Sequence, residues 1–181
     1  MSDLFDDVTE DQDPFKRLLS KIPGFGGYIE RQNRRAADKI LRELIGERFR
    51  AIWKRVGEVQ QDLVSQGEIL QLDDIEKAAT KIQTFIDKVE NAAYGYSSFF
   101  EAEKINEEEL KSIYEFDVSL LALEDDFLRA VENIESSFGS DGLPASISHL
   151  VTLSRDLVET FGKRDNMLIE YGKSSSEEAG E

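Results

Sequence analysis

Four carboxylates on one expected helix are the residues whose types and spacing come closest to supporting chemistry: Asp117, Glu124, Asp125 and Asp126. Asp117 and Glu124 are seven residues apart, so both adjoin the same apolar stripe of an α-helix. Carboxyl groups beside an apolar core can have raised pKa values and act as general acids or bases. No histidine, nucleophile or glycine-rich loop accompanies them along the chain, and they border a complete apolar stripe. We therefore interpret them as the polar edge of a packed helix, and we expect no catalytic residue and no enzyme.

The residue types that hold metals and cofactors are sparse. The chain has no cysteine, which excludes disulfides, thiolate metal sites and a catalytic cysteine. Its single histidine, His149, lies off the apolar stripe of its expected helix and should be exposed. A di-iron bundle needs Glu-x-x-His on two helices, whereas Ser146 stands three residues before His149. No EF-hand loop is present. We expect no metal and no cofactor.

A glycine cluster in residues 23–28, with the sequence PGFGGY, invites comparison with a phosphate-binding loop. The Gly-Lys-Ser/Thr ending of a P-loop is missing, and no strand precedes the cluster, as a dinucleotide fingerprint requires. We interpret the segment as a Gly-rich hinge.

Long amphipathic helices are the elements that would position all of these residues. Residues 29–66 carry one stripe at helical steps of three and four, with Trp53 beside it as an expected core or stripe residue. Three further stripes cover residues 72–93, 106–138 and 144–171. Stripes of this length cannot be buried alone, so the helices must pack together. We expect these side chains to be buried: Leu41, Phe49, Ile52, Ile82, Ile86, Leu120, Phe127 and Leu157.

The sequence therefore predicts an all-α fold, an antiparallel bundle of four long helices plus a short N-terminal amphipathic helix. The expected organisation is an acidic flexible arm at 1–13, the short helix at 14–22, the hinge at 23–28, the helical bundle at 29–172 and a disordered acidic tail at 173–181. No stretch is long and apolar enough to span a membrane. The acidic N-terminus is unlike a secretory signal.

The charge is distributed very unevenly. The chain has a net charge of −16, but residues 14–57 hold 12 Lys and Arg against four acids. Two interpretations remain open. The basic helix either packs against the acidic remainder of its own fold or binds an anionic partner.

Two segments are candidate binding surfaces for a partner or a membrane. In residues 14–22, apolar side chains fall on one helical face and basic side chains on the other. Residues 94–100 hold four aromatic residues in seven, which suits either a bundle cap or an exposed patch. The candidate residues are Phe15, Lys16, Arg17, Leu18, Leu19, Lys21, Ile22, Tyr96, Phe99 and Phe100.

The segment from Leu18 to Glu43 resembles the N-terminal signature of a group of bacterial helical proteins associated with membrane-stress systems of the phage-shock and band-7 kind. The resemblance covers about 30 residues and rests on Ile22, Pro23, Gly24, Phe25, Gly27, Tyr28, Glu30, Arg34, Arg35, Ala37, Asp38 and Lys39. It implies no catalytic residue and favours a role near a membrane.

We expect a non-enzymatic, cytoplasmic interaction or scaffold protein that binds a protein partner or self-associates. The alternative is a peripheral membrane protein that uses the basic helix 14–22 at the inner face of the membrane. Nucleic-acid binding through residues 31–55 is disfavoured, because the remaining acidic residues repel phosphate. No small-molecule substrate is indicated.

Overall fold

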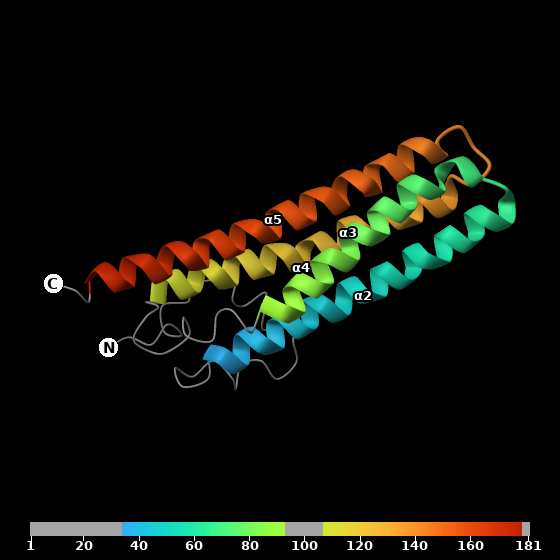
Figure 1. Ribbon diagram of the computed structural model, residues 1–181. Coiled ribbons are helices and arrows are strands. Elements are labelled where there is room, and N and C mark those ends of the chain that lie inside the picture. Colours follow the sequence, from blue (N-terminus) through green and yellow to red (C-terminus); the bar gives the residue numbers. More distant parts are fainter. Residues whose placement is uncertain (1–33, 93–106, 179–181) are drawn as a thin grey trace, which may run out of the picture. The chain divides into compact units, whose positions relative to one another are not determined.

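The computed structural model describes residues 34–92 and 107–178, which form four α-helices packed against each other and, within these ranges, no strand (Figure 1). The helices are α2 (Arg34–Gln66), α3 (Leu72–Asn91), α4 (Glu107–Ser136) and α5 (Leu143–Glu178), and the short 3-10 helix η2 (Ile69–Gln71) precedes α3. The predicted all-α bundle of four long helices is confirmed. The predicted helix at 14–22 and the aromatic segment at 94–100 lie outside the described residues.

Contacts within the chain group it into two compact units. Residues 42–91 and 120–163 form one, which we call the aromatic unit. The described parts of the other, which we call the ion-pair unit, are residues 34–41, 92, 107–119 and 164–178. α2, α4 and α5 contribute residues to both units.

Four phenylalanine rings, one from each helix, form the core of the aromatic unit. The ring of Phe49 in α2 meets Phe85 of α3 at a centroid distance of 4.7 Å and Phe127 of α4 at 5.4 Å. Phe85 also meets Phe161 of α5 at 5.5 Å. All three contacts are edge-to-face, the arrangement that the ring quadrupole favours. This chain of rings connects all four helices through a single core.

The apolar stripes predicted from the sequence form the buried faces of the helices. All eight side chains predicted to be buried are at most 1% exposed. α4 buries a wider face than predicted, because Leu121 and Val131 join the predicted residues in the core. A helix that packs against two neighbours at once needs a broader apolar stripe than a two-helix interface does.

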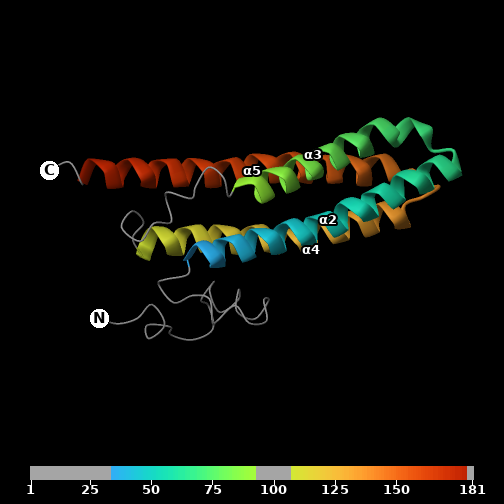
Figure 2. The same cartoon turned by 60° about the horizontal axis from the view of Figure 1, so that its bottom comes forward.

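A glycine follows the last residue of α2. Gly67 has φ of +80°, its N–H donates to the carbonyl of Val64, and the N–H of Glu68 donates to Leu63. This is the Schellman arrangement, which a residue without Cβ adopts at little cost. The connections α2–α3 and α4–α5 lie at the same end of the aromatic unit (Figures 1 and 2).

Two details differ from the sequence prediction. α5 continues to Glu178, beyond the expected bundle end at residue 172. Residues 173–178 contain no proline, and extending an existing helix costs far less than starting one. The prediction that Trp53 is a core or stripe residue is wrong, since its side chain is 38% exposed. Phe49, Ile52 and Val56 already fill the buried face of α2 around it.

Replacing Phe127 tests the aromatic core. We expect Phe127→Ala to lower the free energy of unfolding by about 3–5 kcal/mol, because it removes a ring that is 1% exposed. Chemical denaturation followed by circular dichroism measures this. The control Leu70→Ala, at a side chain that is 92% exposed, should change it by less than about 0.5 kcal/mol. A loss below about 1 kcal/mol for Phe127→Ala would contradict the packing of α4.

Candidate functional site

A buried ion pair in the ion-pair unit involves one of the four carboxylates that the sequence singled out. Arg164 of α5 donates from Nε to Oδ1 of Asp117 at 2.7 Å and from Nη2 to Oδ2 at 3.0 Å. Asp117 is 0% exposed and Arg164 is 1% exposed. Two parallel bonds of this kind are the strongest form of an arginine–carboxylate contact. The pair links α4 to α5 and is closed to solvent, so it is not placed to meet a substrate.

This pair was not predicted, although both of its members were visible in the sequence. The stripe of α5 contains Arg164 at a position where an apolar residue is expected, and Asp117 was assigned to the polar edge of α4. A buried cation requires a buried acceptor, since an isolated charge in a core is very costly. An arginine on one stripe and an aspartate beside another were the available signal.

The other three of the four carboxylates named from the sequence do not assemble into a catalytic group. Glu124 accepts from Arg48 at 3.4 Å, Asp126 pairs with Arg129 on the same helix, and Asp125 is exposed. Among the residues that the structure describes, no group of three or more His, Cys, Asp or Glu side chains could hold a metal ion.

Four arginines of the basic segment, Arg42, Arg48, Arg50 and Arg55, contact the fold's own acids and carbonyls. Arg55 donates to both oxygens of Glu135, at 2.8 and 2.6 Å, and this hydrogen bonding raises the pKa of the guanidinium above its ordinary high value. Arg50 pairs with Glu90, which approaches α2 closely beside Gly46. The interpretation that the basic helix packs against the acidic remainder is confirmed for Arg48, Arg50 and Arg55.

Arg42 is a further case, with its side chain 6% exposed. It donates to the backbone carbonyl of Val89 at 3.4 Å, and so joins α2 to the last turn of α3.

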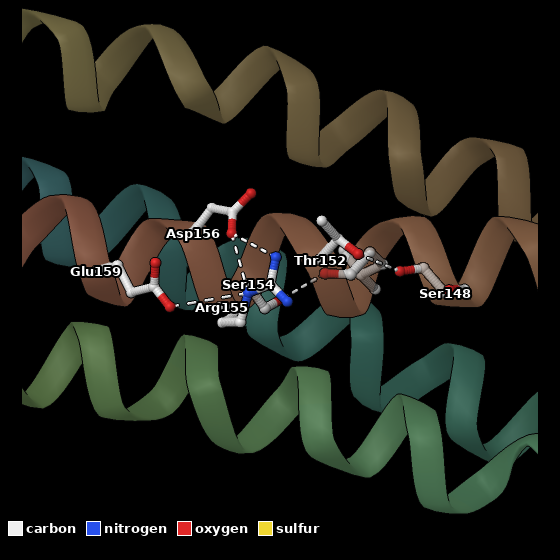
Figure 3. Close-up of polar contacts among 7 residues, drawn as sticks. Ser148, Thr152, Ser154, Arg155, Asp156 and Glu159 are labelled. Carbon is white, nitrogen blue, oxygen red and sulfur yellow. Dashed lines mark hydrogen bonds and ion pairs between the residues drawn. The ribbon is translucent and has the colours of Figure 1, made fainter.

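Polar groups on α5 are also used within the helix. Arg155 contacts Asp156 at 3.0 Å and Glu159 at 3.8 Å, and the hydroxyl groups of Thr152 and Ser154 donate to backbone carbonyls one turn earlier (Figure 3). Ser154 is buried, and the carbonyl of Leu150 accepts the hydrogen bond of its hydroxyl group. His149 is exposed, as predicted.

An open groove lies between α2 and α3 in the aromatic unit. It has a volume of about 830 Å³ and is lined by Trp53, Gly57 and Gln61 from α2 and by Ala79, Gln83 and Thr84 from α3. Gly57 widens it, because a Cβ placed there would meet nothing within 4 Å. Most of the lining residues are polar or charged, although the surface that they present to the groove is more apolar than polar, and the groove is open, unlike the enclosed pockets that hold small molecules. Its dimensions and chemistry suit a peptide segment better.

The charge at this groove is negative. Glu58, Glu76 and Asp87 line it together with a single cation, Lys54. A segment with basic side chains therefore complements it.

The candidate residues named from the sequence at 15–22, together with Tyr96, Phe99 and Phe100, lie outside the described residues. The groove was not predicted, because Trp53 was expected to be a core or stripe residue. The available signal was a tryptophan just outside a stripe that is already complete, followed by Gly57 one turn later.

No protein-family model matches this chain, and no match was found among curated proteins or among solved structures. The N-terminal resemblance therefore stays a prediction. In the part of the chain that the structure describes, no helix is long and apolar enough to cross a membrane.

The buried ion pair yields a stability prediction. We expect Asp117→Leu alone to destabilise the protein by about 3–5 kcal/mol, because it leaves the buried guanidinium without its carboxylate. Adding Arg164→Met should recover most of that loss, since an apolar pair of similar volume needs no counter-charge. Urea denaturation of both variants gives the comparison. If the double variant is as unstable as the single one, the pair's charges are not what stabilises this contact.

Proposed function

We propose that this chain is a non-enzymatic interaction protein that binds a helical protein segment in the groove between α2 and α3. One observation carries the proposal: Trp53 is 38% exposed in an open groove, beside a glycine that keeps the groove wide. Tryptophan is over-represented among the residues that dominate binding energy at protein interfaces, because it offers a large rigid surface with one polar group.

The size of the groove supports a helical ligand. A helix of nine residues is about 13 Å long and about 10 Å across, so its volume is on the order of 1,000 Å³. The groove volume of about 830 Å³ is comparable. Gln61 offers a side-chain amide to a ligand. The side-chain oxygens of Gln83 and Thr84 can accept hydrogen bonds, since Gln83 already donates to Asp87 and Thr84 to the carbonyl of Thr80.

The charge pairing within the bundle also favours the groove, rather than the basic face of α2, as the binding surface. Arg48, Arg50 and Arg55 contact carboxylates of α3 and α4, so their charge is largely neutralised where a nucleic acid would need it.

The peripheral-membrane alternative depends on residues 14–22. These residues lie outside the described ranges, and no observation on the described residues favours this alternative over the groove.

Gly57→Arg tests the proposal directly. The substitution fills the groove and adds a positive charge, while the open space around Gly57 and the helix propensity of arginine should preserve folding. Gly162→Arg in α5 is the matched control, because a Cβ there also meets nothing within 4 Å and Gly162 does not line the groove.

Partners are first recovered by binding to the unaltered chain and are then purified. Calorimetric titration measures their affinity for each variant. We expect Gly57→Arg to raise the dissociation constant at least about tenfold, a change of about 1.4 kcal/mol, and Gly162→Arg to leave it unchanged. The proposal would be contradicted if Gly57→Arg left the dissociation constants of these partners unchanged. Binding to anionic vesicles that is equally insensitive would favour the membrane alternative.

A further inference from the structure

We propose that the groove between α2 and α3 takes a basic amphipathic helix of a partner protein, in which two cations about three turns apart pair with Glu76 and Asp87. The apolar face between these cations lies against Trp53. The inference rests on the proposed function of the groove, and it adds the chemistry and the residue spacing of the ligand.

Two acids of α3 carry the charge that the lining of the groove leaves unbalanced. The one cation of the lining, Lys54, stands four residues before Glu58 on α2, so these two side chains are neighbours on the helix surface. Glu76 and Asp87 are exposed on α3, and no Lys or Arg among residues 72–91 lines the groove. Lys77, which follows Glu76 in the sequence, pairs instead with an acid of the preceding turn. A cationic ligand therefore meets two carboxylates that the lining does not neutralise.

The spacing of these two acids defines the spacing of the ligand's cations. Glu76 and Asp87 are eleven residues apart, which places them on nearly the same side of α3 and about 16 Å apart along its axis. A ligand helix that lies along α3 presents one cation to each acid when its own cations have the same separation. It then needs about twelve residues, and because the groove is open, only one face of it is covered.

The centre of the groove suits apolar side chains of such a helix. Ala79 stands between the two acids on α3, Trp53 lies on the facing wall, and the surface of the lining is more apolar than polar. An amphipathic helix laid in a groove is a recurrent mode of peptide recognition, in which the apolar face supplies contact area. Opposite charges at its two ends then decide which helices bind, since like charges placed together are strongly disfavoured.

A synthetic peptide provides the probe. It is an alanine-based helix of about 16 residues, long enough to form some helix by itself. Its two lysines are placed at the spacing of Glu76 and Asp87, and two leucines take the positions that match Thr80 and Gln83. Because the steps of four, three and four residues between these positions read the same in both directions, the peptide fits either way along α3.

Emission of Trp53, the one tryptophan of the chain, measures peptide binding to the full-length protein. We expect the lysine peptide to shift this emission to shorter wavelength. Two control peptides should bind with dissociation constants at least about tenfold higher. One has glutamates in place of the lysines. In the other, one lysine is moved two residues inward, which places it on the opposite side of the peptide helix.

Reversing the two charges of α3 gives the sharpest test. Glu76→Lys with Asp87→Lys should raise the dissociation constant of the lysine peptide at least about tenfold and lower that of the glutamate peptide by a similar factor. Gained binding of the glutamate peptide cannot result from unfolding. The matched control is Asp125→Lys with Asp141→Lys, which changes the net charge equally at exposed acids outside the lining and should alter neither constant.

Three results would overturn the inference: no emission shift with the lysine peptide, equal affinity for the lysine and glutamate peptides, or a charge reversal that leaves the preference as it was. An emission that shifts with protein concentration alone would assign the groove to a second copy and would overturn it as well. If the inference fails and a recovered partner still loses affinity with Gly57→Arg, the proposed function stands with a ligand of other chemistry. If Gly57→Arg affects neither that partner nor the lysine peptide, both proposals fail.

Discussion

The packing of Phe49 against Phe85 and Phe127 is the interaction on which the rest of the aromatic unit depends. It fixes the rotation of α2 about its own axis, because a ring that meets two other helices cannot turn without leaving one of them. Once that rotation is set, the stripe from Leu41 to Leu63 is buried. The side chains between stripe positions are then directed to defined places, with the arginines beside carboxylates of α3 and α4 and Trp53 at the surface.

The rotation of α2 also explains why three arginines of the basic segment, Arg48, Arg50 and Arg55, are paired with carboxylates of the same chain. Each of these residues lies at the border of the stripe, where its side chain reaches a carboxylate on a neighbouring helix. Exposed pairs of this kind contribute little to stability individually. Their effect is on specificity, since they favour acidic neighbours for α2. The groove, in contrast, is lined by three acids and one lysine, so its charge is not balanced within the lining.

The sequence was sufficient to predict the four helices and the residues that form their core, because stripes such as Leu41 to Leu63 and Ile75 to Val89 repeat at the helical period over many turns. It was insufficient where one side chain depends on another that is distant in the sequence. Asp117 and Arg164 are 47 residues apart, and nothing local indicates that they meet. The prediction for Trp53 was wrong for a local reason. Its apolar character suggested burial, but the stripe of α2 was already complete without it. Trp53 and Gly57 were a local signal of the groove on α2, but its α3 wall could not be predicted, since it depends on which faces of the two helices remain uncovered once both stripes are buried.

Nuclear Overhauser contacts between side-chain rings in the full-length protein test the central claim most directly, because they report the rotation of α2. The account predicts cross-peaks from the ring protons of Phe49 to those of both Phe85 and Phe127, whose ring centroids lie 4.7 and 5.4 Å away. Cross-peaks from the Trp53 indole to Phe85 and Phe127, in place of those from Phe49, would contradict it. They would mean that α2 is turned by about 40° and that the surface assigned here to the groove faces the core.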